Sequence, residues 1–173
     1  MKIVWHYTYH SKVGQSSVVD ILRTKVLLPP ALIPDYQDGC PDADAHADRK
    51  LLLFSENEFW EPASYRGITV NGEMVLLHKR EEYAKHGIAI FRIGVDAAIL
   101  TPYLRLTRKV GMNKGMAASL FKLARELGAN PYQWYGTTSP VPLAQWRKIE
   151  WLRGDVWTAD LPEIAAMAKG GAQ

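Results

Sequence analysis

The chain begins with a run of residues that is typical of a β-strand. β-Branched and aromatic residues dominate residues 3–8, IVWHYT, and such residues favour strands. After a Gly/Ser segment, Ser17 can cap a helix whose apolar residues fall on one face. The chain extends again over residues 26–28 and then reaches two prolines. The pattern therefore predicts a strand, a short helix and a second short strand.

Short apolar runs predict the other strands. Residues 51–54, LLLF, form a continuous apolar run of the kind found at the buried centre of a sheet. Within residues 88–95, apolar side chains recur at alternate positions, which places them on one face of a strand. We expect further strands at 73–78 and 132–136, and a hairpin of 146–152 with 156–158 around an Arg-Gly-Asp turn.

The clearest helix runs from Asn113 to Gly128. Its apolar residues recur at helical spacing, and we expect all of them in the core: Met116, Leu120, Leu123 and Leu127. Charged residues 79–85 predict an exposed turn or a short helix, and residues 160–170 a last short helix. Strands and helices mix without regular βαβ alternation. This order predicts an α+β fold with a mostly antiparallel, split or two-sheet core, in one domain of residues 1–173.

Residues 29–50 lack any hydrophobic period and contain four prolines and five aspartates. Loops of this length often act as lids or binding loops, so this segment is the candidate lid. Alternate positions of the segment carry Asp42, Asp44, His46 and Asp48, which resembles a metal loop. The EF-hand pattern is not met, since the sixth position lacks glycine and the twelfth lacks glutamate. We predict a solvated loop and no metal.

Composition limits the compartment and the partners that we expect for the protein. One cysteine in 173 residues excludes an intramolecular disulfide, and the net charge of +3 is milder than that of most nucleic-acid-binding domains. The N-terminus does not resemble a signal peptide, and no apolar run approaches the roughly 20 residues that span a bilayer. We expect a cytoplasmic protein that does not contact a membrane.

Several well-known catalytic motifs are absent from the sequence. It has no phosphate-binding Gly-x-x-x-x-Gly-Lys-Ser/Thr loop and no Gly-x-Gly-x-x-Gly. It also lacks His-Glu-x-x-His, Gly-x-Ser-x-Gly and the cysteines of a zinc deaminase site. The remaining chemistry lies in three separated segments.

These segments occur in a suggestive order. His6 and Thr8 share one side of the first strand, Phe54-Ser55 is followed about ten residues later by Ala63-Ser64-Tyr65, and Glu150 lies late in the chain within WRKIEW. In this order and spacing the chain resembles the ADP-ribosyltransferase superfamily. It is most similar to DNA-modifying toxin transferases and RNA 2′-phosphotransferases, and its Ser/Tyr loop to that of poly-ADP-ribose polymerases. The resemblance covers about a third of the chain. The chain departs from the family pattern in the Ser/Tyr loop, where Pro62 intervenes and Ser64 is shifted from the position of the motif serine. For the arginine that toxin-type members use, Arg49 is the candidate.

The resemblance implies an NAD-utilising transferase that breaks the bond between nicotinamide and ribose. Glu150 would stabilise the positive charge that develops on the ribose, although Glu61, which also follows an aromatic pair, stays open as the critical carboxylate. His6 and Thr8 would bind a ribose hydroxyl. Trp60 or Tyr65 would stack on the nicotinamide ring. Ser55 or Ser64 would form a hydrogen bond with its carboxamide. ADP-ribose would pass to a nucleic acid or a protein.

Two alternatives accompany this hypothesis. An NAD-dependent RNA 2′-phosphotransferase would need arginines around the phosphate, and Arg105, Arg108 and Lys109 form the candidate basic cluster. A non-catalytic binding or inhibitor module of the same fold would use the six tryptophans at an interface. The enzyme hypothesis requires His6 and Glu150 to face the same side of the domain.

Overall fold

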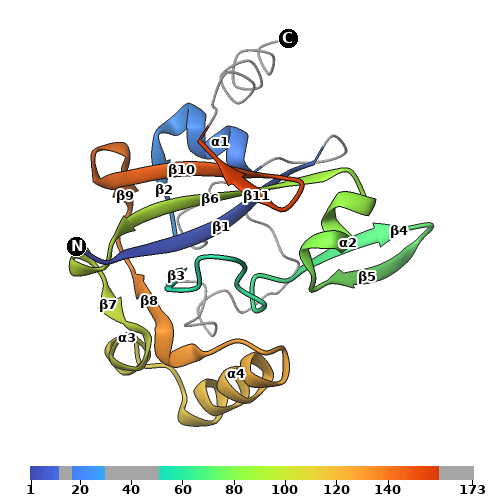
Figure 1. The fold of residues 1–173 in the computed structure, drawn as a ribbon. Helices are drawn as coiled ribbons and strands as arrows, with labels where there is room; N and C mark the ends of the chain where they lie inside the picture. Colours follow the sequence, from blue (N-terminus) through green and yellow to red (C-terminus); the bar gives the residue numbers. More distant parts are fainter. Residues whose placement is uncertain (12–16, 30–50, 160–173) are drawn as a thin grey trace.

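The computed structural model describes residues 1–11, 17–29 and 51–159 (Figure 1). The strands are β1 (Ile3–Ser11), β2 (Val26–Leu27), β3 (Leu52–Ser55), β4 (Arg66–Val70), β5 (Glu73–Leu77), β6 (Ile88–Asp96), β7 (Thr101–Pro102), β8 (Trp134–Thr137), β9 (Val141–Pro142), β10 (Trp146–Arg153) and β11 (Val156–Thr158). The α-helices are α1 (Ser17–Thr24), α2 (Arg80–Lys85), α3 (Tyr103–Lys109) and α4 (Lys114–Glu126). Short 3₁₀ helices occur at Ala97–Ile99, Pro131–Gln133 and Leu143–Gln145.

Among the described residues, seven strands form one open sheet in the order β11-β10-β6-β1-β3-β8-β7. The strand pairs in this sheet are antiparallel, and β2 with β9 and β4 with β5 form two separate ribbons. The predicted α+β class with mostly antiparallel strands is therefore confirmed. β1 pairs with β6 from Ile3 to Ser11, whereas its register with β3 consists of Trp5 opposite Ser55. The sheet is thus loosely joined between β1 and β3.

The register assigns each side chain of β1 to a face of the sheet. His6 lies opposite Ile93 of β6, and Ile93 lies opposite Ile149 of β10. The next residues in register are Tyr7, Arg92 and Glu150. Because directly opposite residues point to the same side and neighbours in a strand alternate, these two sets occupy opposite faces. We call the side with His6 the α1 face and the side with Tyr7 the hairpin face.

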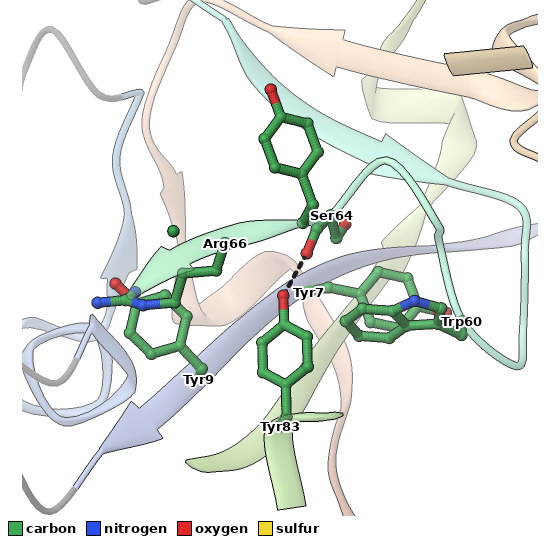
Figure 2. A pocket seen from close by; sticks show the side chains of 8 residues that line it. Tyr7, Tyr9, Trp60, Ser64, Arg66 and Tyr83 are labelled. Carbon is green, nitrogen blue, oxygen red and sulfur yellow. Dashed lines mark hydrogen bonds between the residues drawn. The ribbon is translucent and has the colours of Figure 1, made fainter. Parts of the chain in front are cut away.

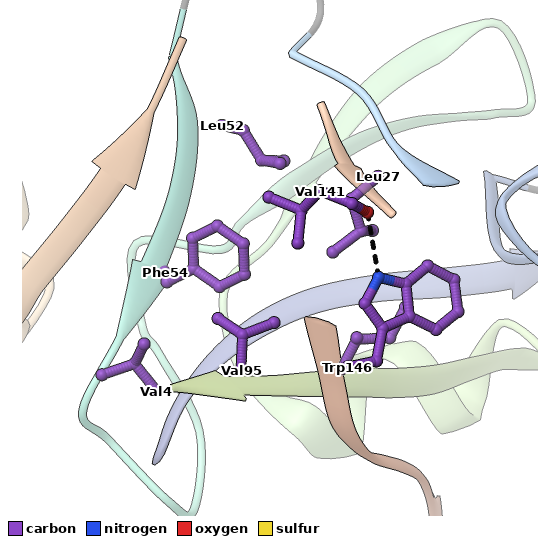
Figure 3. Close-up of a cluster of buried hydrophobic side chains, with 8 residues drawn as sticks. Val4, Leu27, Leu52, Phe54, Val95, Val141 and Trp146 are labelled. Carbon is purple, nitrogen blue, oxygen red and sulfur yellow. Dashed lines mark hydrogen bonds between the residues drawn. The ribbon is translucent and has the colours of Figure 1, made fainter. Parts of the chain in front are cut away.

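The α1 face carries the main core. Buried side chains from six strands pack together there, and Figure 3 shows Val4, Leu27, Leu52, Phe54, Val95, Val141 and Trp146. The Trp146 indole donates its Nε1 proton to the Val141 carbonyl at 3.0 Å, which joins β10 to the β2–β9 ribbon. Val18 of α1 packs on Phe91 beside Trp151. The predicted apolar face of α1 therefore seals this side of β1 and β6.

The β4–β5 hairpin and α2 cover part of the hairpin face. Leu77 and Tyr83 are buried against Ile88 and Ile90 of β6, with Tyr9 packed beside them. α3 and α4 lie together at the other end of the sheet, below β8 in Figure 1. They pack through Tyr103, Leu106 and Ala124 on Leu51 and Trp134, and these residues form a second buried cluster.

The structure changes some details of the predicted elements. Helix α4 begins after Asn113, whose side chain accepts a hydrogen bond from the Gly115 backbone, as its sequence predicts. Its Leu123, however, is 40% exposed, so the expectation that the whole stripe is core was wrong at this residue. Helix α3 and strand β4 were not predicted. The candidate lid at 29–50, with Arg49, and the helix at 160–170 lie outside the described residues apart from Pro29.

No helix in the described ranges combines the length and the apolar composition needed to cross a membrane. In the same ranges, His, Cys, Asp and Glu side chains form no group of three or more that could hold a metal ion. The alternating Asp and His positions from Asp42 to Asp48 lie outside these ranges.

Candidate functional site

The segment between β3 and β4, which we call the 56–65 loop, crosses the hairpin face and is held there by the strands beneath it. Three successive backbone carbonyls of the loop accept hydrogen bonds from side chains of three strands. Tyr7 Oη donates to the Asn57 carbonyl, Arg92 Nη1 to the Glu58 carbonyl, and Trp157 Nε1 to the Phe59 carbonyl at 3.0 Å. The Asn57 side chain also accepts from the Phe59 and Trp60 amides at 3.1 and 3.3 Å. The loop backbone is therefore anchored.

A buried serine and a buried glutamate form a pair where this loop leaves β3. Ser55 Oγ donates to Glu61 Oε2 at 2.5 Å, and the Ala63 amide donates to Glu61 Oε1 at 3.1 Å. Ser55 is 2% exposed and Glu61 6% exposed. Buried carboxylates need such partners, because an unpaired charge away from water is strongly unfavourable. The pair closes the loop on itself and places a carboxylate beside β1.

An ion pair occupies the same face on β6 and β10. Arg92 Nε donates to Glu150 Oε2 at 2.7 Å, and Nη2 contacts the same carboxylate. The Arg92 guanidinium lies between two indoles, 3.9 Å from the centroid of Trp5 and 4.2 Å from that of Trp157. The side chains of Arg92 and Glu150 are only 8% and 13% exposed. Glu150 is thus neutralised by a close cation.

An aromatic pocket opens beside the anchored loop. Its volume is about 420 Å³, and its walls come from β1, the 56–65 loop, the start of β4 and α2 (Figure 2). The lining residues are Tyr7, Tyr9, Trp60, Ser64, Tyr65, Arg66, Gly67 and Tyr83. The lining has one cationic side chain and no carboxylate. This combination suits a flat ligand that carries negative charge or good hydrogen-bond acceptors.

The pocket walls are fixed by contacts between the aromatic rings. The Trp60 ring packs edge-on against Tyr7 and Tyr83, with centroids 5.4 Å apart in both pairs. Trp60 Nε1 donates to the His78 carbonyl at 3.0 Å, and Tyr83 Oη donates to the Ser64 carbonyl at 2.9 Å. Burial raises the pKa of Tyr83 to about 12, so its hydroxyl stays a proton donor at neutral pH. The pocket is therefore largely preformed.

Arg66 forms one wall of the pocket. Its guanidinium carbon lies 3.3 Å from the centroid of the Tyr9 ring, and Figure 2 shows the two side chains stacked. Burial lowers the pKa of Arg66, an effect that the nearby Tyr83 hydroxyl opposes. The ring contact holds the plane of the guanidinium, and its buried Nε has no hydrogen-bond acceptor among the described residues.

Only some of the predicted site residues line the pocket. Trp60, Ser64 and Tyr65 line it together. Ser55 lies outside the lining, bound to Glu61. Glu150 lies on the same face as the pocket but pairs with Arg92. These positions keep the Ser/aromatic loop as a candidate site.

His6 and Thr8 lie on the α1 face, opposite to the pocket and to Glu150. Thr8 is 6% exposed and lies in register with the buried Phe91. His6 packs against the Phe54 ring at 5.6 Å and donates from Nδ1 to the Leu53 carbonyl at 3.0 Å, across the join between β1 and β3. Burial lowers the pKa of His6. The required convergence of His6 with Glu150 is not found, because their positions in register differ by one residue.

Sequence reasoning missed several residues of the site. Arg92 is the one charge in the apolar run 88–95, and such a residue needs a partner when its strand is central. Tyr7 and Tyr9 alternate with His6 and Thr8, yet only the register shows that they face the pocket. Arg66 and Tyr83 had no recognisable signal. Arg105, Arg108 and Lys109 are exposed on α3 and are not part of the pocket lining.

Comparisons with protein-family models, curated proteins and solved structures found no match to this chain. The assignment of a function therefore depends on the geometry of the site.

Proposed function

We propose that the chain is a nucleotide-binding protein with an ADP-ribosyltransferase-like split sheet, which holds one half of NAD in the aromatic pocket and does not cleave it through Glu150. The pocket is the observation that carries this proposal. Its volume of about 420 Å³ lies within the range of roughly 300–1,000 Å³ that is common for small-molecule sites. Aromatic walls favour a base or a nicotinamide ring, because both stack on flat faces.

The state of Glu150 favours binding without cleavage at this residue. Cleavage of the nicotinamide–ribose bond needs a carboxylate whose charge is directed at the ribose. Arg92 already uses Nε and Nη2 on the Glu150 carboxylate. His6 and Thr8, the expected ribose contacts, lie across the sheet. We therefore assign Glu150 a structural role on the hairpin face and no role in cleavage of the nicotinamide–ribose bond.

The second candidate is an NAD-utilising ADP-ribosyltransferase in which Glu61 is the carboxylate. This candidate is favoured by the position of Glu61 in the 56–65 loop, which also supplies the lining residues Trp60 and Ser64. Ser55 would orient Glu61 through their 2.5 Å hydrogen bond. ADP-ribose would then pass to a nucleic acid or protein acceptor. No described cation beyond Arg66 lines the pocket, which leaves the RNA 2′-phosphotransferase without support.

The test combines binding with turnover. Isothermal titration calorimetry with NAD is made on the wild type, on Tyr65→Ala in the pocket and on the matched control Tyr132→Ala. Tyr65 and Tyr132 are 43% and 68% exposed, so neither substitution removes a buried ring. Stacking contributes roughly 1–3 kcal/mol per base. Tyr65→Ala should therefore weaken NAD binding about tenfold, and Tyr132→Ala should leave it unchanged.

Nicotinamide release, followed by chromatography, separates the two candidates. We expect NAD binding and no release from the wild type. Release that is lost in Glu61→Gln and kept in Glu150→Gln would establish the second candidate instead. Release that is lost only in Glu150→Gln would overturn the structural assignment of Glu150. No binding at millimolar NAD would refute both candidates.

A further inference from the structure

We infer that Arg66 is the anion-binding residue of the aromatic pocket and that the ligand presents a phosphate group to it. This inference depends on the proposed nucleotide function and specifies its ligand as a nucleotide, in contrast to a nucleoside or a free base. It follows from the contacts that Arg66 makes and from those it lacks.

The first observation is a contrast between the two arginines of this face. Arg92 donates hydrogen bonds to the Glu150 carboxylate and to the Glu58 carbonyl. Arg66 contacts the Tyr9 ring, but its Nε is sealed from solvent and has no acceptor, and no hydrogen bond or ion pair of its guanidinium occurs among the described residues. A partly buried guanidinium with unused donors gains free energy when an anion or acceptor enters.

The second observation is the distribution of charge around the pocket. Arg66 is the one charged residue in the lining. Glu61 and Glu58 act on Tyr7, and Glu82 acts on Tyr83, but none of these carboxylates is part of the lining. Burial lowers the pKa of Arg66, because a partly buried guanidinium is hydrated less than an exposed one. An anionic group on the ligand would supply the missing compensation.

The geometry favours a phosphate. The Tyr9 ring stacks on one side of the guanidinium at 3.3 Å and fixes its plane, so the edge of the plane carries the N–H donors. A guanidinium edge binds phosphate oxygens in pairs, with geometry that a lysine cannot reproduce. The neighbouring Trp60, Tyr65 and Tyr83 rings then offer a stacking surface for the base. A nucleoside phosphate satisfies both parts of the pocket.

The experiment compares AMP, adenosine and inorganic phosphate by calorimetry on the wild type, Arg66→Gln, Arg66→Lys and the matched control Arg108→Gln. Arg108 is exposed on α3, away from the pocket. For the wild type we expect AMP to bind roughly 10- to 100-fold more tightly than adenosine. Arg66→Gln should remove this preference and leave adenosine binding unchanged, Arg66→Lys should retain part of it, and Arg108→Gln should match the wild type.

Salt dependence gives a second measurement that does not need a variant. Added salt should weaken AMP binding and leave adenosine binding nearly constant, because salt screens the interaction between Arg66 and the phosphate. Equal affinity for AMP and adenosine would overturn the inference and leave the nucleotide-pocket function standing. Binding of a phosphotyrosine peptide without binding of AMP or NAD would refute the nucleotide function while keeping the phosphate contact.

Discussion

The contacts of Arg92 predict a large loss of stability when this side chain is shortened or neutralised. Arg92→Met would leave the Glu150 carboxylate, whose side chain is 13% exposed, without its cation. Removal of one partner of a buried ion pair costs roughly 3–5 kcal/mol. The substitution also removes the cation between the Trp5 and Trp157 rings, worth about 0.5–1 kcal/mol per ring, while the methionine keeps part of the packing. We expect a loss of about 4 kcal/mol in the free energy of unfolding.

Urea unfolding at pH 7, followed by tryptophan fluorescence, measures this loss from the midpoint and slope. Arg92→Lys serves as the control that keeps the charge, and it should cost about 2 kcal/mol because the forked contact with Glu150 and the Glu58 carbonyl bond are lost. The double variant Arg92→Met/Glu150→Leu should be more stable than Arg92→Met alone, since no buried charge stays unpaired.

Two results would refute this reasoning. One is a loss below about 1 kcal/mol in Arg92→Met, which is the range of exposed ion pairs. The other is a double variant that is no more stable than Arg92→Met alone, which would mean that Glu150 is not left as an unpaired buried charge. Either result would free Glu150 for the catalytic role that its place in the sequence suggested.

Three further predictions concern the same region. Ser55→Ala should destabilise the protein by about 2 kcal/mol in urea unfolding, because the buried Glu61 carboxylate loses a donor; no change would mean that Glu61 reaches water. Burial lowers the pKa of His6 below its unfolded value near 6.5. The unfolded chain therefore binds more protons, so stability should fall as pH drops from 7 to 5, and less so in His6→Gln. Gly94→Ala should cost roughly 1–3 kcal/mol because its Cβ would lie 2.8 Å from the Trp5 ring; a wild-type melting temperature would contradict this.

The sequence predicts most strands and helices because their patterns are local. The strand at residues 3–8 is found within β1, and the short helix predicted after it is found as α1. The hairpin of β10 and β11 turns at Gly154, whose φ of 60° suits glycine. Each of these elements is encoded by neighbouring residues, so one stretch of sequence suffices to predict it.

The assembly of the site could not be predicted in the same way. Both faces of β1 are covered, so Val4 on one side and Trp5 on the other are equally apolar and buried. Alternation then identifies two faces without showing which one meets the pocket. The pairing of Arg92 with Glu150 depends on the register of β6 and β10, which includes an irregularity between Trp146 and Lys148. Single-sequence patterns contain no information on that register.

The three anchored carbonyls of the 56–65 loop have a consequence for the evolution of the pocket. The course of the loop backbone is determined by Tyr7, Arg92 and Trp157, which belong to other segments of the chain. Tyr65 of the same loop, in contrast, is 43% exposed, and its side chain lines the pocket without holding the loop on these strands. Side chains at such positions can be exchanged while the backbone keeps its path. Ligand preference at the rim of the pocket can therefore diverge among descendants of this chain without a loss of folding stability.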